Sequence, residues 1–304
     1  MGEPELRVSS PERSRPSRRR VAVRRAARAT LVLGVLGVGG WAGASLLQNG
    51  EEPPPPTETA LQLVRLRIIF PEGFTRREMA ERVAAVREIA IAKRGVTPRL
   101  TGTGYVRASA KAHPPPGFLR DSKGRSVEGF LFPSTYEFSQ YTPSSELVGD
   151  QLKTFQRQWK KVDLRYAKSK NLTPYDVLII ASMIEKETVA NEERRLVAAV
   201  IYNRLRQGMP LGIDATIRYG RNVPGTEPLR QSDIDSDDPY NTRRRQGLPP
   251  TPISNPGLAS MRAAAHPARV DYLFFVRKPD DVHHFFTASE SEFFRKKCEY
   301  GFGC

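Results

Sequence analysis

The stretch Asn171–Thr188, NLTPYDVLIIASMIEKET, combines a helix start, a continuous apolar run and a charged end. Thr173 suits the N-cap position, Pro174 the first helical position and Asp176 the first turn. Seven apolar residues follow between positions 177 and 184, interrupted only by one serine. A helix that is apolar on every side is normally buried in a core. We therefore expect the fold to be built around this helix.

The apolar helix runs directly into Glu185, Lys186 and Glu187. At about 100° per residue, Glu185 lies over Ser182, whereas Glu187 points to the roughly opposite face. At most one of the two carboxyls can therefore face a given cleft. Desolvation raises the pKa of a carboxyl, and this is how a glutamic acid becomes a general acid near neutral pH. Spacing alone favours a solvated helix end, so a catalytic assignment needs further support.

The charge of the chain indicates an anionic partner. Its 304 residues carry 48 Lys and Arg against 33 Asp and Glu, a net charge of +15. No helix-turn-helix, zinc-knuckle or RNA-binding aromatic signature accompanies this charge, so a nucleic-acid partner is not expected. Nine of the arginines lie within Met1–Arg28.

The N-terminal part of the sequence predicts a membrane anchor. Residues 1–28 form a basic tail without apolar periodicity and are expected to be disordered. Residues 29–47 contain no charge over nineteen positions, which is enough for a single transmembrane helix. A cleaved signal peptide is the alternative, but the run is longer than a usual signal core and lacks a small-x-small cleavage site. The arginines place the N-terminus in the cytoplasm, and we expect everything beyond the Pro-rich linker 48–60 to be extracytoplasmic in this cell-membrane protein.

The remaining chain predicts a mixed α+β fold. Expected helices share apolar spacing of three to four residues and occupy Arg76–Ala92, Ser144–Val162, a segment from Asn191 to Gly208, Leu258–Ala265 and Ser289–Lys297. Expected strands are Leu61–Phe70, Glu128–Phe138 (broken by Pro133), Tyr272–Arg277 and His284–Thr287, and Leu211–Tyr219 is a strand or loop. The Pro- and Asn-rich segment Asp237–Gly257 is expected to be a long functional loop.

Several chemistries are excluded by residue type and spacing. The four histidines lack the spacing of metal ligands, and no G-x-S-x-G, phosphate-loop or dinucleotide motif is present. We therefore expect neither a metal nor a cofactor. Carboxylate chemistry outside the cytoplasm remains, with carbohydrate as the natural substrate. Most glycosidases use two carboxylates, whereas only one carboxyl here occupies a clearly unusual position.

A series of ordered blocks resembles the endolytic murein transglycosylases, the YceG-like or MltG family. They are PEGFT (71–75), EGFLFPSTYEF (128–138), IIASMIEKET (179–188), VAAVIYNRLRQGMPL (197–211), DATIRYG (214–220), DPYNT (238–242), GLPPTPISNPG (247–257) and AAAHP (263–267). The resemblance implies that Glu185, the first Glu of E-K-E-T, is the catalytic residue. It also implies a LysM-like β–α module over 61–110, followed by a catalytic domain over 111–300. The chain departs from the family at Gly212-Ile213, where a polar residue usually precedes the Asp, and over Gly95–Ala112.

The resemblance further implies cleavage of the MurNAc–GlcNAc β-1,4 bond in nascent peptidoglycan, with formation of 1,6-anhydro-MurNAc and termination of glycan elongation. Peptidoglycan strands are then the substrate, and peptidoglycan synthases are candidate partners. One carboxyl suffices, because an internal hydroxyl nucleophile has a high effective molarity. Candidate substrate-binding residues are Ser182, Asn203, Asp214, Thr216, Tyr240, Asn241 and Asn255. Two alternatives stay open: a cell-wall-binding scaffold without turnover, and a hydrolase that uses Asp214 or Glu187 to activate water.

Overall fold

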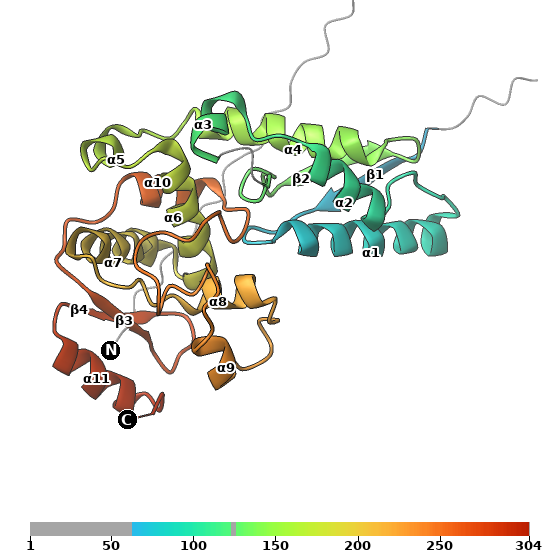
Figure 1. Ribbon diagram of the computed structural model, residues 1–304. Coiled ribbons are helices and arrows are strands. Elements are labelled where there is room, and N and C mark those ends of the chain that lie inside the picture. The colour runs from blue at the N-terminus through green and yellow to red at the C-terminus, as the bar shows by residue number, and fades with distance from the viewer. Residues whose placement is uncertain (1–62, 123–125, 304) are drawn as a thin grey trace, which may run out of the picture. The chain divides into compact units, whose positions relative to one another are not determined.

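The computed structural model describes residues 63–122 and 126–303 (Figure 1). The expected basic tail, membrane span and linker 48–60 lie outside the described residues. Within the described part of the chain, no helix is both long and apolar enough to cross a bilayer.

The described residues form a mixed α+β structure with two small sheets. Its strands are β1 (Arg65–Ile69), β2 (Thr135–Ser139), β3 (Phe274–Arg277) and β4 (His284–Thr287). The longer helices are α1 (Arg76–Arg94), α2 (Gly102–Lys111), α4 (Ser144–Trp159), α6 (Pro174–Glu187), α7 (Arg194–Gln207), α8 (Asp214–Arg221), α10 (Leu258–Ala265) and α11 (Glu290–Glu299). The shorter ones are α3 (Leu119–Ser122), α5 (Arg165–Ser169) and α9 (Gln231–Ile234), with 3-10 turns at Pro116–Phe118 and Asn191–Glu193.

Helix α6 forms as the sequence predicts, because its caps are local. The Thr173 hydroxyl accepts a hydrogen bond from the Asp176 N–H at 3.1 Å, and the Asp176 carboxylate accepts one from the Thr173 N–H at 2.9 Å. The helix ends at Thr188, whose N–H and hydroxyl both donate to the Ile184 carbonyl, at 3.0 and 2.8 Å. These bonds define both ends of the element that carries Glu185.

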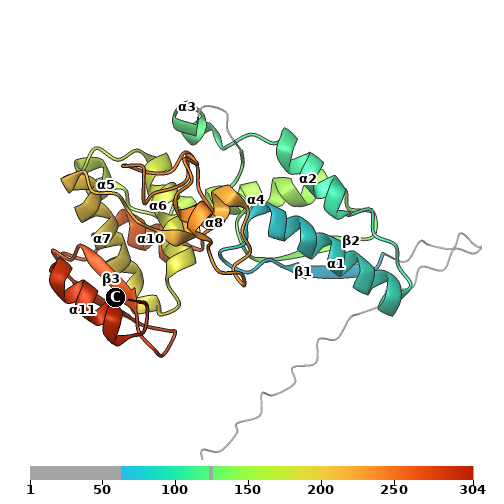
Figure 2. The ribbon, with the colours of Figure 1, turned by 60° about the horizontal axis from the view of Figure 1, so that its bottom comes forward.

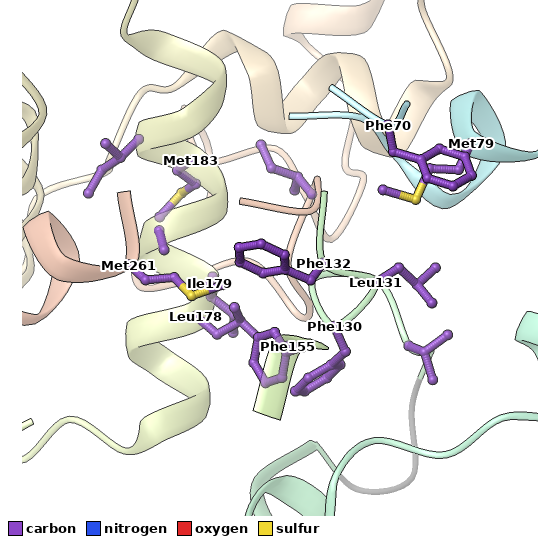
Figure 3. Packing of buried hydrophobic residues seen from close by; sticks show 14 of the residues in the cluster. Phe70, Met79, Phe130, Leu131, Phe132, Phe155, Leu178, Ile179, Met183 and Met261 are labelled. Atoms are coloured by element: carbon purple, nitrogen blue, oxygen red, sulfur yellow. The ribbon is translucent and has the colours of Figure 1, made fainter. Parts of the chain in front are cut away.

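The core surrounds α6. Every residue from Val177 to Ile184 is buried, and the helix packs against α10 and α7. Figure 3 shows Leu178, Ile179 and Met183 of α6 close to side chains that include Phe132 and Met261. Burying one large apolar side chain contributes about 1.5–3 kcal/mol. The helix is thus held from several sides and is a rigid support for its C-terminal carboxyls.

Strands β1 and β2 pair antiparallel, with Leu66 opposite Phe138 and Ile68 opposite Tyr136 (Figure 2). These four side chains face the core, whereas the alternating residues of both strands are exposed. Helix α1 packs on α2, and α2 packs on α4. The pairing of β1 with β2 therefore joins the segment before residue 110 to the segment after it.

Two sequence-based expectations are corrected by the structure. Leu211–Tyr219 is neither strand nor loop over its second half, because helix α8 starts at Asp214 and buries Thr216 and Ile217. The strand expected from Glu128 begins only at Thr135, since the chain turns at Gly129 with φ +88° and Phe130 packs between Phe118 and Phe155.

The C-terminal hairpin and helix follow the prediction closely. Strands β3 and β4 pair antiparallel, and α11 packs on both. The Ser289 hydroxyl caps α11 by accepting from the Glu292 N–H at 3.3 Å. Cys298, near the end of α11, is disulfide-bonded, and Cys304 lies outside the described residues.

Candidate active site

The Glu185 carboxylate is held at both oxygens. Arg194 donates to Oε1 at 3.2 Å from the first turn of α7, and the Gly257 N–H donates to Oε2 at 2.8 Å from the residue before α10. The side chains of Glu185 and Arg194 are 5% and 9% exposed. Both donors stabilise the negative charge of a carboxylate in a partly dry setting. The last turn of α6 thus presents one fixed carboxylate.

Arg194 is itself fixed in place by two further partners. Its Nε donates to the Ser260 hydroxyl at 3.0 Å, and its Nη1 donates to the Asn191 side-chain oxygen. Arg194 also borders a hollow of about 620 Å³, which is lined by Lys161, Arg195, Arg262 and His266 and by one acidic residue, Asp163. The guanidinium therefore connects Glu185 to a basic surface hollow.

Ser182 and Asn255, two of the candidate site residues, position the loop that brings Gly257 to Glu185. The Ile253 N–H donates to the Ser182 hydroxyl at 3.0 Å, which in turn donates to the Ile179 carbonyl at 2.7 Å. The Ser254 hydroxyl donates to the Ser182 carbonyl at 3.0 Å. These bonds attach the loop along α6, one turn before Glu185.

Asn255 joins three segments that are far apart in sequence. Its side-chain amide donates to the Phe74 carbonyl at 2.9 Å and to Glu128 at 2.7 Å, and its side-chain oxygen accepts from the Leu131 N–H at 2.9 Å. Its backbone carbonyl accepts a hydrogen bond from the Gly73 N–H, and its backbone N–H donates to the Phe74 carbonyl. Fully buried and bonded on every side, Asn255 positions the site instead of presenting a free amide to a sugar.

Glu128 is a buried carboxyl that lies behind this junction. It accepts from the Arg76 N–H at 3.0 and 3.1 Å, from Asn255, and from the Tyr219 hydroxyl at 3.3 Å. Burial raises its pKa to about 7, although these donors act in the opposite direction. From the sequence Glu128 is only a fallback for the general acid after Glu185, because the local signal is a Glu before an aromatic run.

Glu187 points away from Glu185, as the helical spacing predicts. It lies near the start of α8, where the Ala215 N–H donates to it and Asp214 adds negative charge. Burial, and then the charge of Asp214, raise its pKa to about 7, whereas Arg277 lowers it. Asp214 is paired with Arg243 at 2.7 Å and is nearly half exposed.

The other candidate substrate-binding residues hold loops in place. Asn203 donates to the Val270 and Tyr272 carbonyls, both at 2.9 Å. Thr216 donates to the Ile213 carbonyl at 2.6 Å and shares a hydrogen bond with Thr242 at 2.9 Å. The Tyr240 hydroxyl lies 2.7 Å from that of Thr251, and Asn241 donates to the Ile234 and Ser236 carbonyls at 2.8 Å.

Two residues near Glu185 were missed by sequence reasoning: Glu72 and Gly257. Both lie within blocks that resemble the family, but their proximity depends on contacts between segments that are nearly two hundred residues apart. Among residues 63–122 and 126–303, no group of three or more His, Cys, Asp or Glu side chains is placed to hold a metal ion. His284, the most buried histidine, bonds Glu193 at 2.7 Å instead.

Comparison with known proteins finds relatives that are named endolytic murein transglycosylases. The chain is 29% identical over 272 residues to an endolytic murein transglycosylase of Streptococcus pneumoniae (strain R6), a match that covers 84% of this chain and 47% of that protein. It is 37% identical over 155 residues to one of Bacillus subtilis (strain 168), covering 50% of this chain and 42% of that protein. The chain therefore spans less than half the length of these curated relatives.

A solved structure also resembles this one. The 2.6 Å crystal structure of a yceG-like protein from Listeria monocytogenes superposes with a TM-score of 0.65 at 27% identity, covering 76% of each chain. The YceG-like family model matches residues 45–299. The chain therefore belongs to the YceG-like family.

Proposed function

We propose that this protein is a lytic transglycosylase that cleaves within peptidoglycan strands at the MurNAc–GlcNAc β-1,4 bond. The names of its curated relatives support this activity. The observation that carries the proposal is the position of Glu185: it ends a rigid buried helix, and Arg194 and the Gly257 N–H fix its direction.

In the proposed reaction, a proton from the active centre passes to the leaving glycosidic oxygen as the bond from C1 to that oxygen breaks. The C6 hydroxyl of MurNAc then bonds C1, and its proton passes to Glu185. In the simplest scheme Glu185 performs both transfers. The nucleophile belongs to the substrate and has a high effective molarity, so no second carboxylate is needed to activate water.

The proposed cellular setting follows from the sequence. Residues 29–47 anchor the protein in the cell membrane, with the N-terminus in the cytoplasm, and residues 61–110 act as a LysM-like module next to the catalytic part. Synthases that make nascent strands are proposed partners, and cleavage would terminate their elongation. A reporter that works only outside the cytoplasm should be active when it is fused after Gly50. Activity at the same position of a reporter that works only in the cytoplasm would contradict this topology.

The decisive experiment for the activity is end-group analysis of glycan strands digested by the full chain. A lytic transglycosylase leaves 1,6-anhydro ends. A hydrolase that activates water with Asp214 or Glu187 leaves free reducing ends, and a non-catalytic scaffold leaves no new ends. Only the first result supports the proposal.

A further inference from the structure

The turn between β1 and α1 lies directly on the last turn of α6. Gly73 has φ +79°, and a β-carbon there would lie 3.5 Å from Glu185 Cγ, which is ordinary contact. The Gly73 N–H donates to the Asn255 carbonyl at 3.0 Å, and the Lys186 ammonium donates to the Gly73 carbonyl at 3.3 Å. These contacts place the preceding residue, Glu72, at the same helix end as Glu185.

The Glu72 carboxyl contacts the glycine that bonds Glu185. A β-carbon on Gly257 would lie 1.8 Å from Glu72 Oε1 and 2.6 Å from Oε2, so the carboxyl fills the space beside the Gly257 α-carbon. The N–H of this glycine donates to Glu185 Oε2 at 2.8 Å. Two carboxyl groups from distant parts of the chain therefore flank one residue.

The two carboxyls differ in accessibility and in their partners. Glu185 is 5% exposed and is engaged at both oxygens, whereas Glu72 is an exposed residue. Desolvation of its carboxyl, and then the negative charge of Glu185, raise the pKa of Glu72, while Arg194 lowers it. The charged groups around Glu72 are thus Glu185 and Lys186 on α6 and Arg194 on α7; the segment 251–257 carries no ionisable side chain.

We propose that Glu72 is a second catalytic carboxyl, which donates the proton to the leaving glycosidic oxygen while Glu185 accepts the proton of the C6 hydroxyl. This rests on the proposed function and divides its two proton transfers between two residues. The turnover leaves Glu72 as carboxylate and Glu185 protonated, and one proton transfer between the neighbouring groups, directly or through water, restores the starting state. Two nearby carboxyls that lie in different environments are typical of acid–base pairs.

The test compares Glu72→Gln and Gly257→Ala with the matched control Glu81→Gln, an exposed carboxyl on α1. Formation of anhydro ends is measured with the full chain as kcat and KM from pH 4 to 9, a range wide enough to include both limbs of the profile. Alanine fits the backbone at position 257, where φ is −76°. The added methyl group of Gly257→Ala displaces the Glu72 carboxyl without removing a charge.

For Glu72→Gln we expect kcat to fall at least about 100-fold with little change in KM, since general acid–base groups contribute about 10²–10⁴-fold. The alkaline limb of the pH profile should also move, because that limb belongs to the pair. Gly257→Ala should lose a comparable part of kcat, and Glu81→Gln should match the parent.

Three results would overturn the inference. The first is a kcat of Glu72→Gln within about twofold of the parent with the same pH profile, and the second is an effect on KM alone. Should Glu72→Gln fail to fold, a fully active Gly257→Ala would be the third. If the parent itself leaves no anhydro ends, the proposed function fails and the inference fails with it; the parent measurement therefore separates the two.

Discussion

Arg194 controls the charge balance around the proposed catalytic residue. It is buried and donates to Glu185, Ser260 and Asn191. Arg194→Met would leave the Glu185 carboxylate without its cation in a nearly dry position. Removing one partner of a buried ion pair costs about 3–5 kcal/mol, so we expect the free energy of unfolding to fall by about 3 kcal/mol.

Chemical denaturation of the full chain measures this loss. Arg77→Met is the control, since its pair with Glu81 is exposed and should contribute less than about 1 kcal/mol. Equal stability of the two variants would show that the Glu185–Arg194 pair is not a buried, coupled pair.

The raised pKa of Glu128 predicts that the stability of the protein depends on pH. Its pKa is raised from 4.5 to about 7, so the folded protein holds this proton to higher pH than the unfolded chain does. The native state then binds more protons between about pH 4.5 and 7, and the free energy of unfolding falls as the pH rises through this interval. The shift corresponds to about 3 kcal/mol.

Glu128→Gln should remove this part of the dependence, leaving the part due to Glu187, whose pKa is raised in the same direction. The measurement is urea unfolding of parent and variant at pH 5 and pH 8. Identical pH dependence in both proteins would contradict the assignment.

At the residue scale, sequence reasoning could name Glu185 but not its surroundings. Two local features carry the prediction: the E-K-E-T motif, through its resemblance to the family, implies Glu185 as the catalytic residue, and the helical spacing places Glu187 on another face. Arg194 lies outside the family-like blocks, between IIASMIEKET (179–188) and VAAVIYNRLRQGMPL (197–211). The contact of Glu72 with Gly257 exists only after folding, when the β1–α1 turn and the loop before α10 meet on α6.

At the scale of elements, helix α2 shows where local patterns fail. It contains Gly102 and Gly104, which disfavour a helix, so the sequence of this segment does not predict one. The glycines let α2 lie close to α1 and to the start of α4. A β-carbon on Gly102 would lie 2.8 Å from the Ala80 carbonyl, and one on Gly104 would lie 2.8 Å from the Ser144 hydroxyl. By contrast, the sequence predicts α6, α10 and β4, because the apolar pattern of each, and the N-cap of α6, lie within their own segments.

A pair of glycine substitutions tests this explanation. Gly149→Ala in α4 meets nothing within 4 Å, so the higher helix propensity of alanine should stabilise the protein by up to about 1 kcal/mol. Gly102→Ala makes the same chemical change but forces α1 and α2 apart, and it should destabilise by about 1–3 kcal/mol. Melting temperatures that rise for both variants would contradict the close packing of α1 on α2.

At the scale of the whole molecule, the described residues form one compact unit. Strand β1 pairs with β2, α2 packs on α4, and the Tyr105 hydroxyl donates to Gln151 at 2.6 Å. All three contacts join the segment before residue 110 to the segment after it. The proposed LysM-like module thus shares its core with the proposed catalytic part.

Fragments of the chain provide the corresponding prediction. A fragment of residues 59–304 should unfold in one cooperative transition. A fragment of residues 111–304 loses β1, α1 and α2, leaves β2 without its partner, and should show no cooperative transition. Circular dichroism during heating distinguishes the two, and a cooperative 111–304 fragment would show that the first segment is dispensable for folding.

If the Glu185 carboxyl takes part in the chemistry, paired substitutions at the end of α6 should separate its role from that of Glu187. Glu185→Gln keeps the side-chain shape but removes proton transfer, whereas Glu187→Gln makes the same change on the face that meets α8. Anhydro ends released from peptidoglycan strands by the purified full chain are counted for both. We predict a fall of at least about 10²–10⁴-fold for Glu185→Gln and near-parent activity for Glu187→Gln. Near-parent release of anhydro ends by Glu185→Gln would show that the Glu185 carboxyl does not transfer protons in the reaction.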